Sequence, residues 1–361
     1  MKLLIIAPEQ IAVPPSVSGS VENCIYQIAK HASNEHQITI VSVLRNHLPH
    51  KSAMNNLTIL RVPGGSKRVY LANALRAVKG RSYDLIQIDN RPRFARAVRQ
   101  AFPNTPISIF LHSLTFVSSP MTTTKTAKED LKHVDIIIGN SKSLQKSLKN
   151  RFPAHSNKIK FVHLGVDTDK FRPGIKPNSN RFRVLFAGRL IPRKGVPTLL
   201  KAVRIARRSA PFISLSVAGG TRKTAYTAYL KRMAHALNIP VTFTGNLSRK
   251  RMPAFYRTGD CFVCPSQKHE AFGLVNVEAM ASGLPVIASR NGGIPEIVQH
   301  GRNGLLVERY HVPSAFAAPI VKLALNSKLR RLLSRRARVD ALNRFSWRRT
   351  AARLMGIYSR F

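Results

Sequence analysis

Acidic residues are scarce in this sequence of 361 residues. It contains 16 Asp and Glu against 59 Lys and Arg, a formal net charge of +43. A charge of this size repels itself within the fold and attracts polyanions. Two explanations stay open, because the basic residues are spread along the whole chain. One is an anionic partner, such as nucleotide phosphates, an anionic polymer, an acidic membrane or nucleic acid. The other is a compositional bias that leaves solvated basic faces.

Cysteine is also rare. The three cysteines, Cys24, Cys261 and Cys264, cannot all pair with one another, so a reducing intracellular setting is expected. Cys261 and Cys264 form a C-x-x-C, a pattern that can bind zinc or carry redox chemistry. They lie in an apolar strand pattern, however, and a second C-x-x-C is missing. Small buried side chains are therefore the better interpretation.

Long apolar runs and several catalytic motifs are missing as well. The run MKLLIIAP is too short for a signal peptide, and no stretch approaches the roughly 20 apolar residues of a membrane span. We expect a cytoplasmic protein, soluble or peripheral at a membrane. The sequence has no G-x-S-x-G, H-E-x-x-H or G-x-x-x-x-G-K-[ST], and its first half has no G-x-G-x-x-G. This disfavours esterase, zincin and P-loop functions.

Strand and helix patterns alternate along the chain, whose length favours two domains. The strands expected in the first half are residues 2–7, 36–44, 57–62, 83–88, 107–111, 135–139 and 158–164. After a polar, Pro-rich segment at 173–180, expected to be a linker, the pattern restarts with strands at 182–187, 213–218 and 241–244. This alternation predicts an α/β protein with two doubly wound parallel sheets, whose ligands bind at the carboxyl ends of strands.

Several local features can be predicted from residue type. Ser20 is expected to cap a helix over 21–33, and Ser141 a helix that runs to 149. The segment 113–128 is polar and rich in helix breakers, which predicts a mobile loop. The tail 345–361 reads as an amphipathic helix anchored by Trp347, Leu354 and Tyr358.

The stretch 261–298 carries the strongest site pattern. A buried strand at 261–264 leads to a loop with Glu270, a helix over 273–282 with Glu278, a strand at 285–288 and a loop that ends at Glu296. The helix start offers unpaired N–H groups to a phosphate. Glu270 precedes the helix and Glu278 lies inside it, so a paired acid/base arrangement for hydrolysis is not favoured. Either carboxylate can equally be a solvated or salt-bridged surface group.

Other candidate residues lie at expected strand ends. Arg189 and Lys194 stand between the strand at 182–187 and a helix over 196–207, and a diphosphate suits an Arg fork beside a Lys point charge. His112 follows the strand at 107–111 and can donate to a sugar hydroxyl or a phosphate, although a lone histidine is more often structural. Gly19 allows close approach of a ligand to the backbone, or serves only as a loop hinge.

Jointly, these motifs resemble those of the family-4 retaining glycosyltransferases with the GT-B fold. EAFGLVNVE, at 270–278, is similar to the family's E-x7-E signature. The resemblance extends to GVDTDKF at 165–171, GRLIPRKG at 188–195, VAGG at 217–220, ASGLPVIAS at 281–289, GGIPEIV at 292–298 and FSWRR at 345–349. It spans nearly the whole chain. IQIDNRP and FLHSLTFV further resemble the spore coat protein SA type.

The resemblance implies two Rossmann-like domains, an acceptor-side one over 1–172 and a nucleotide-sugar-binding one over 181–340, with a closing helix over 341–361 that crosses back. It implies retaining transfer of a hexose-type sugar from a UDP- or GDP-linked donor to a glycan, lipid-linked or protein acceptor. Neither a metal nor another cofactor is implied. The implied donor-site residues are Glu270, Gly273, Leu274 and Val275 for the sugar, Glu278 for the ribose, Arg189 and Lys194 for the diphosphate, and His112 and Gly19 from the first domain.

Two positions depart from the family pattern. The Gly-Gly loop reads Ser18-Gly19-Ser20, which leaves acceptor or phosphate contacts open, and Asn-Gly-Val-Asp reads Leu164-Gly165-Val166-Asp167, which affects the interdomain connection. One alternative is a structural spore-coat or surface protein that retains the fold and binds an anionic polymer. Nucleic acid is a weaker possibility, because no basic-aromatic reading surface is evident.

Overall fold

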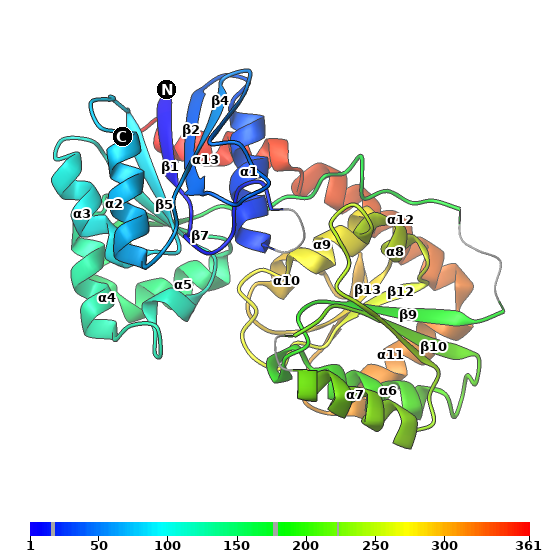
Figure 1. The fold of residues 1–361 in the computed structure, drawn as a ribbon. Coiled ribbons are helices and arrows are strands. Elements are labelled where there is room, and N and C mark those ends of the chain that lie inside the picture. Colours follow the sequence, from blue (N-terminus) through cyan, green and yellow to red (C-terminus); the bar gives the residue numbers. More distant parts are fainter. Residues whose placement is uncertain (16–18, 176–179, 222–223) are drawn as a thin grey trace. The chain divides into compact units, whose positions relative to one another are not determined.

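The computed structural model describes residues 1–15, 19–175, 180–221 and 224–361, and the chain divides into two compact units (Figure 1). The N-terminal unit comprises Met1–Gly165 and Trp347–Phe361, and the C-terminal unit comprises Val166–Ser346. Each unit has a sheet of its own, flanked by helices. The predicted α/β class with two Rossmann-like sheets is confirmed.

The N-terminal unit is built on eight strands in the order β3-β4-β2-β1-β5-β6-β7-β8. Their bounds are β1 Lys2–Ile6, β2 Gln37–Val43, β3 Lys51–Met54, β4 Leu57–Val62, β5 Leu85–Asp89, β6 Ile107–Leu111, β7 Ile136–Gly139 and β8 Ile159–Phe161. All pairs are parallel except β3 with β4. The sequence did not predict β3, because this short edge strand is polar and largely exposed, without an apolar alternation.

Helices cover the sheet of this unit. Their bounds are α1 Ser20–Ala32, α2 Lys67–Ala77, α3 Ala95–Ala101, α4 Thr124–Asp130, α5 Lys142–Arg151 and α13 Trp347–Tyr358, with short 3-10 turns at Pro92–Phe94, Leu114–Val117, Leu131–His133 and Pro153–Lys158. Ser141 caps α5 as predicted, since its side chain accepts a hydrogen bond from the Leu144 N–H. Helix α13, from the end of the chain, packs against α1.

Two local predictions for this unit are wrong. Helix α1 is preceded by Gly19 at the N-cap, and Ser20 is its first helical residue and not its cap. The segment 113–128 is not an irregular loop, because it contains the turn Leu114–Val117 and most of α4. The side chains of Ser113 and Thr123 accept hydrogen bonds from the first turns of these two elements. The hydroxyl residues that resemble helix breakers therefore act as caps.

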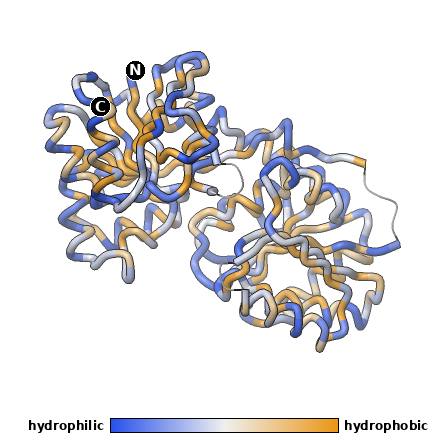
Figure 2. The backbone as a smooth tube through the Cα atoms, in the orientation of Figure 1, coloured by the Kyte–Doolittle hydropathy of each residue, from blue (hydrophilic) through white to orange (hydrophobic). Residues whose placement is uncertain are grey.

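The C-terminal unit is built on six parallel strands in the order β11-β10-β9-β12-β13-β14. Their bounds are β9 Phe182–Ala187, β10 Ile213–Ala218, β11 Val241–Gly245, β12 Cys261–Cys264, β13 Val286–Ser289 and β14 Gly304–Val307. The central strands are buried on both faces, which explains their continuous apolar sequences (orange in Figure 2). Cys261 and Cys264 are buried side chains, as predicted.

The helices of the C-terminal unit lie on both faces of its sheet (Figure 1). Their bounds are α6 Val196–Ala206, α7 Thr224–Ala236, α8 Met252–Arg257, α9 Leu274–Ala281, α10 Ile294–Ile297, α11 Pro313–Leu325 and α12 Ser327–Arg344, with a 3-10 turn at Pro192–Lys194. Helix α6 packs against α11, and α9 packs against α12. The loop that was predicted to end at Glu296 includes the start of the short helix α10, at Ile294.

The first boundary between the units lies earlier than the expected linker at 173–180. Residues 166–172 belong to the C-terminal unit, since the Val166 N–H bonds the Phe345 carbonyl at 2.7 Å and Arg338 donates to the carbonyls of Thr168 and Phe171. These long-range bonds outweigh the apparent break in sequence pattern. Positions 176–179 of the expected linker, like Ser18 of the glycine loop, lie outside the described residues.

The second boundary lies later than the expected residue 341. Helix α12 continues to Arg344 within the C-terminal unit, because Asp340 accepts a hydrogen bond from Asn303 at 2.7 Å and is 5% exposed. The closing helix α13 therefore begins at Trp347. Its three predicted anchors, Trp347, Leu354 and Tyr358, are at most 2% exposed.

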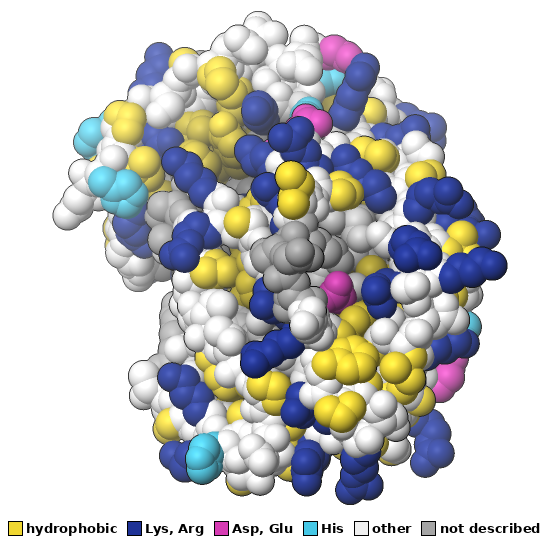
Figure 3. All heavy atoms as spheres, turned by 90° about the vertical axis from the view of Figure 1, so that its right-hand side faces the viewer, with side chains coloured by type: hydrophobic (Ala, Val, Ile, Leu, Met, Phe, Trp, Pro, Cys, Tyr) yellow, Lys and Arg dark blue, Asp and Glu magenta, His cyan; other side chains and the backbone are white. Residues whose placement is uncertain are grey.

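Basic side chains are prominent on the face that Figure 3 draws. Figure 3 shows one face on which Lys and Arg are scattered among apolar side chains and greatly outnumber Asp and Glu. On that face the charge is not gathered into a single patch. In the described part of the chain, no helix is both long and apolar enough to cross a membrane.

We expect Leu354→Ala to lower the free energy of unfolding of the N-terminal unit by about 2–5 kcal/mol, because it leaves a cavity where a fully buried side chain anchors α13. Urea unfolding followed by the fluorescence of Trp347, the sole tryptophan, measures this loss. Arg353→Ala, exposed on the same helix, is the control and should change the free energy by less than about 0.5 kcal/mol. An unchanged midpoint for Leu354→Ala would contradict the packing of α13.

Candidate functional site

The carboxyl ends of β9 and β12 define the centre of the C-terminal unit's candidate site. From β9 the chain proceeds to β10 on one side, and it later returns to β12 on the other side. Loops that leave two such strands diverge and open a crevice at the switch point, where ligands of doubly wound sheets bind. Arg189 and Lys194 lie in the loop after β9, and Glu270 lies in the loop after β12.

An ion pair joins these two loops. The ammonium of Lys194 bonds the carboxylate of Glu270, which also accepts a hydrogen bond from the Ser266 hydroxyl at 3.1 Å. The two charged side chains are 16% and 15% exposed. Burial acts to raise the pKa of Glu270, but Lys194, Arg193 and Ser266 outweigh it and hold the pKa below its ordinary value. Glu270 is therefore an ionised carboxylate, fixed in place at the switch point.

The backbone around Glu270 is fixed by the loop after β13. The Glu270 N–H donates to Asn291 Oδ1 at 3.1 Å, the Gly293 N–H donates to the Glu270 carbonyl at 2.8 Å, and Asn291 Nδ2 donates to the Ser266 carbonyl at 2.7 Å. Gly292 has φ 54°, and a Cβ there would lie 2.1 Å from the Glu270 carbonyl oxygen. Only glycine allows the two loops to approach this closely.

Helix α9 starts directly after the loop that follows β12 and carries Glu270. Gly273 is the N-cap, and Leu274 and Val275 occupy the first two helical positions. Their N–H groups have no acceptor within the helix and carry the positive end of the helix dipole. The start of α9 lies beside the Glu270 side chain, since a Cβ on Gly273 would lie 3.5 Å from Glu270 Cγ.

Glu278 has a different environment. It lies inside α9, 6% exposed, where it accepts a hydrogen bond from the buried Tyr256 hydroxyl at 3.0 Å and lies 3.5 Å from Arg249 Nη2. Burial raises the pKa of Glu278, and Arg249 and Tyr256 offset this only in part. The two carboxyl groups therefore have different partners and opposite pKa shifts.

Arg189 is more exposed than Arg193 and Lys194, although part of it is desolvated. Among the residues that the structure describes, none accepts a hydrogen bond from its guanidinium. Burial and the nearby Arg193 lower the pKa of Arg189, and Glu270 acts in the opposite direction. Three cations, Arg189, Arg193 and Lys194, thus interact electrostatically with the Glu270 carboxylate, and Lys194 contacts it directly. An anionic ligand is suited to this excess of positive charge.

The N-terminal unit has its own switch point, between β1 and β5. Glu9 follows β1 and Arg91 follows β5, and they form a bidentate ion pair with nitrogen–oxygen distances of 2.7 and 3.2 Å. The Arg91 guanidinium also lies 4.5 Å from the centre of the Phe116 ring. This buried pair fixes the two loops to each other, as Lys194 and Glu270 do in the other unit.

His112, at the carboxyl end of β6, is held through its Nε2, its ring face and its backbone. Its Nε2 lies 3.0 Å from Asp89 Oδ1, and its ring stacks on Phe110 with centroids 4.6 Å apart. Its N–H donates to Asn90 Oδ1 at 2.9 Å, and its carbonyl accepts from Asn140 Nδ2 at 3.0 Å. The ring orientation is thus determined by the fold.

Gly19 lies over a buried carboxyl group. Its φ is 126°, and a Cβ there would lie 2.8 Å from Glu22 Oε2. Glu22 is 5% exposed, and burial raises its pKa against the effects of its own backbone N–H and of the nearby His112 and Arg91. Glycine at position 19 therefore makes room for a carboxyl group that belongs to the same electrostatic cluster as His112.

Several residues of these clusters were not predicted. In the C-terminal unit they are Arg193, Arg249, Tyr256, Ser266 and Asn291, and in the N-terminal unit Glu9, Glu22, Asp89, Asn90, Arg91 and Asn140. Position after a strand was the available signal for Asp89, Asn140, Ser266 and Asn291. Tyr256 and Arg249 carried none, because their side chains reach Glu278 from a distant helix and loop.

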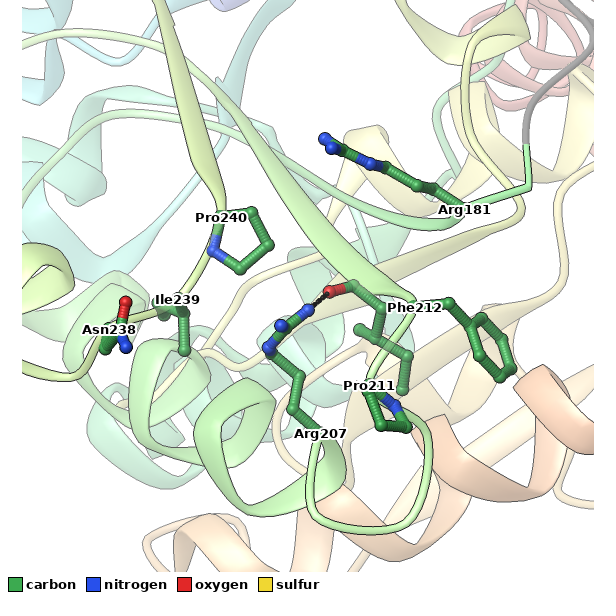
Figure 4. Close-up of a pocket in the computed structure, with 8 residues that line it drawn as sticks. Arg181, Arg207, Pro211, Phe212, Asn238, Ile239 and Pro240 are labelled. Atoms are coloured by element: carbon green, nitrogen blue, oxygen red, sulfur yellow. Dashed lines mark hydrogen bonds between the residues drawn. The ribbon is translucent and has the colours of Figure 1, made fainter.

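The structure also bears on other possible sites. Among the described residues, no group of three or more His, Cys, Asp or Glu is placed to hold a metal ion. A cavity in the C-terminal unit is lined by residues that include Arg207, Phe212, Asn238 and Pro240 (Figure 4). It lies where β10 and β11 begin, and Arg207 donates to the Ile213 carbonyl there. The cavity is thus at the amino ends of the strands, whereas Lys194 and Glu270 lie at the carboxyl ends.

Comparison with known families matches both halves of the chain. A family model described as Glycosyltransferase Family 4 matches residues 19–170, and one described as Glycosyl transferases group 1 matches residues 167–340. The putative glycosyltransferase YtcC of Bacillus subtilis is 30% identical over 377 residues, covering 99% of this chain and 92% of the relative. Spore coat protein SA of the same species is 27% identical over 379 residues, covering all of both chains.

Solved structures share the fold. Sucrose-phosphate synthase from Thermosynechococcus elongatus has a TM-score of 0.85 and 21% identity, over 100% of this chain and 99% of that chain. Anabaena HepE, solved in complex with UDP-glucose, has a TM-score of 0.79 and 21% identity, over 100% of both chains. At this level of identity the likeness concerns the fold alone.

We expect Glu270→Gln to lower the free energy of unfolding at pH 7 by about 1–3 kcal/mol, because it leaves the Lys194 ammonium without its partner. The folded pKa of Glu270 lies below its ordinary value of 4.5, so its stabilisation is complete above that pH and is lost as the pH falls through the folded pKa. The difference between variant and native protein should therefore shrink in acid. Urea unfolding at a series of pH values from 7 to 3 measures it, and a pH-independent difference would contradict the assigned ionisation.

Proposed function

Because the chain belongs to the family-4 glycosyltransferases with the GT-B fold, we propose that it transfers a hexose-type sugar, with retention of configuration, from a UDP- or GDP-linked donor to an acceptor. The observation that carries the proposal is the Lys194–Glu270 ion pair at the switch point of the C-terminal sheet, beside the start of α9. The switch point thus combines a fixed cation, a fixed anion and the N–H groups at the start of α9. In the proposed complex, the cation and the N–H groups bind the diphosphate, and the anion binds the sugar hydroxyls.

The diphosphate is assigned to the positive side of the site. Arg189 offers a planar fork, Lys194 a point charge, and the N–H groups of Leu274 and Val275 the positive end of α9. Charge develops on the diphosphate as the bond between sugar and phosphate breaks, and preorganised donors stabilise it. In the proposed reaction these groups supply the positive charge, and no metal ion takes part.

The two glutamates are assigned to opposite ends of the donor. Glu270, which is ionised and fixed, accepts hydrogen bonds from sugar hydroxyls. Glu278, whose pKa burial raises, faces the ribose hydroxyls of the nucleotide, with Tyr256 and Arg249 to orient its carboxyl group. From the N-terminal unit, we assign His112 to the donor sugar and Gly19 to the loop that approaches the substrates.

Retention follows, in this proposal, from a front-face displacement. The acceptor oxygen forms its bond to the anomeric carbon on the face from which the diphosphate leaves, and the acceptor proton passes to the departing phosphate oxygen. The nucleoside diphosphate then carries the electron pair of the broken bond. The protein's task is to hold both substrates and to stabilise the leaving group.

We assign the acceptor to the class of cell-surface or spore-coat glycans, in free, lipid-linked or protein-linked form. The name of spore coat protein SA supports this, as does that of the lipopolysaccharide 1,2-N-acetylglucosaminetransferase of Salmonella typhimurium, which is 26% identical over 98% of this chain and 96% of the relative. Our proposal places the protein in the cytoplasm, where its net charge of +43 favours peripheral contact with an anionic membrane or polymer.

A second candidate function is a structural protein of a spore coat or surface that retains the fold and binds an anionic polymer. The net charge favours it. Against it stands the retention of Arg189, Lys194, Glu270 and Glu278, since a purely structural protein does not need charged groups assembled at a switch point.

We expect Lys194→Ala and Glu270→Ala each to lower kcat/KM by at least about 100-fold, because each removes a charge that acts on the leaving diphosphate or on the sugar. Release of nucleoside diphosphate from UDP- and GDP-sugars measures the rate. Glu308→Ala is the control, since Glu308 forms an exposed ion pair with Arg290 in the same unit. Full activity of both site variants would refute the proposed donor site.

A thermal-shift panel of nucleotide sugars separates the two candidate functions. A donor at 100 times its dissociation constant should stabilise the protein by about 2.7 kcal/mol, which raises the melting temperature by a few degrees. The shift should disappear in Lys194→Ala. No shift with any UDP- or GDP-sugar, together with a shift from an anionic polysaccharide, would favour the structural function.

A further inference from the structure

A chain of buried hydrogen bonds in the N-terminal unit connects α13 with His112. His112 Nε2 lies 3.0 Å from Asp89 Oδ1, and Asp89 Oδ2 accepts from Gln87 Nε2 at 2.6 Å. Gln87 Oε1 accepts a hydrogen bond from the Tyr358 hydroxyl at 2.9 Å. The same hydroxyl lies 3.0 Å from Ser108 Oγ. Apart from His112, whose side chain is 9% exposed, every member is at most 1% exposed.

The donors and acceptors of this chain follow from its chemistry. The Asp89 carboxylate only accepts, so the Gln87 amide turns its nitrogen toward Asp89 and its oxygen toward Tyr358. Burial raises the pKa of the Tyr358 phenol, so the hydroxyl keeps its proton and donates a hydrogen bond to Gln87 Oε1. Ser108 then donates to Tyr358, and His112 donates its Nε2–H to Asp89. Every hydrogen bond points toward the same carboxylate.

The direction of these hydrogen bonds determines which imidazole nitrogen of His112 can accept a hydrogen bond. With the proton held on Nε2, the neutral ring presents Nδ1 as an acceptor, and among the described residues none donates to Nδ1. Asp89 and Gln87 lie two residues apart on β5 and therefore on one face of the sheet, so strand geometry keeps them aligned. The last turn of α13 supplies Tyr358, which places the closing helix in direct hydrogen-bond connection with β5.

We propose that Asp89, Gln87 and Tyr358 are positioning residues that hold His112 as the Nε2–H tautomer, with Nδ1 presented to a hydroxyl group of the substrate. The inference rests on the proposed function, in which His112 acts on the donor sugar. It adds that the closing helix determines the state of this histidine through Tyr358. In this arrangement α13 contributes a hydroxyl group to the site's support as well as apolar anchors to the core.

Asp89→Asn offers a directional test. Tyr358 still directs the Gln87 oxygen toward itself, so Gln87 Nε2 continues to face position 89. The new asparagine then turns its oxygen toward Gln87 and its NH2 group toward His112 Nε2. The imidazole must accept at Nε2 and carry its proton on Nδ1. The substitution should therefore switch the tautomer while the shape of the side chain is nearly conserved.

The tautomer can be read by 15N NMR of the histidine ring nitrogens, measured at the alkaline end of a pH titration, with His112→Ala to assign the signals. We expect Nε2–H in the native protein and Nδ1–H in Asp89→Asn. Tyr358→Phe, which removes one hydroxyl, should give a mixture of the two tautomers. Thr350→Val is the matched control: it also removes a hydroxyl of α13 that bonds this unit, at the His163 carbonyl, but it should leave the tautomer unchanged.

The kinetic readout uses the same variants. We expect Asp89→Asn to lower kcat by about 100-fold or more, as a wrong tautomer does elsewhere, with little change in KM. Tyr358→Phe should lower kcat by about two- to tenfold, the value of one hydrogen bond, and Thr350→Val should not. Equal losses for Tyr358→Phe and Thr350→Val would show that only the docking of α13 matters, and would overturn the proposal.

The tautomer measurement also separates this inference from the proposed function. A native Nδ1–H tautomer, or an unchanged tautomer in both Asp89→Asn and Tyr358→Phe, overturns the positioning role. If Asp89→Asn does not fold, the comparison of Tyr358→Phe with Thr350→Val decides alone. Tautomers that behave as expected in a protein without turnover on any donor support the hydrogen-bonded chain and refute the proposed function.

Discussion

The parallel sheet imposes the constraint from which the candidate sites arise. Parallel strands bring all their carboxyl ends to one edge, and the loops on either side of a switch point must diverge there. In the C-terminal unit, Lys194 after β9 meets Glu270 after β12, and in the N-terminal unit Glu9 after β1 meets Arg91 after β5. In both units an ion pair of low exposure joins the diverging loops. Separating the two loops would leave each charge without its partner, at a cost in free energy. Each ion pair therefore keeps its two loops in place at the carboxyl ends of the strands.

Different partners give two glutamates of the C-terminal unit different chemistry. Glu270 and Glu278 belong to one motif, yet a cation and a hydroxyl hold the pKa of the first below its ordinary value, while burial raises the pKa of the second. Glu270 therefore stays ionised beside its cations, whereas Glu278 binds a proton more readily. The partners, and not the residue type, determine which task each glutamate can perform.

Helix α13 shows how a distant segment can support a site. Its apolar residues pack into the N-terminal unit, and its Tyr358 hydroxyl joins the hydrogen bonds that lead through Gln87 and Asp89 to His112. A buried network of this kind is stabilising only when every member is satisfied. The position of the helix and the orientation of the histidine are therefore linked by the same requirement.

By itself, the sequence determined the alternation of strands and helices, the buried parallel strands, the α9 start and the separation of Glu270 from Glu278, because these depend on local periodicity and residue type. Only the tertiary structure decided that Lys194 pairs with Glu270, that Tyr256 and Arg249 reach Glu278, and that Asp89 holds His112. It also decided the cap of α1, the helices within 113–128, the strand β3 and the unit boundaries at Gly165 and Trp347. Each of these depends on which partners meet in space, and a pattern that repeats about every 2 or 3.6 residues carries no information about partners far along the chain.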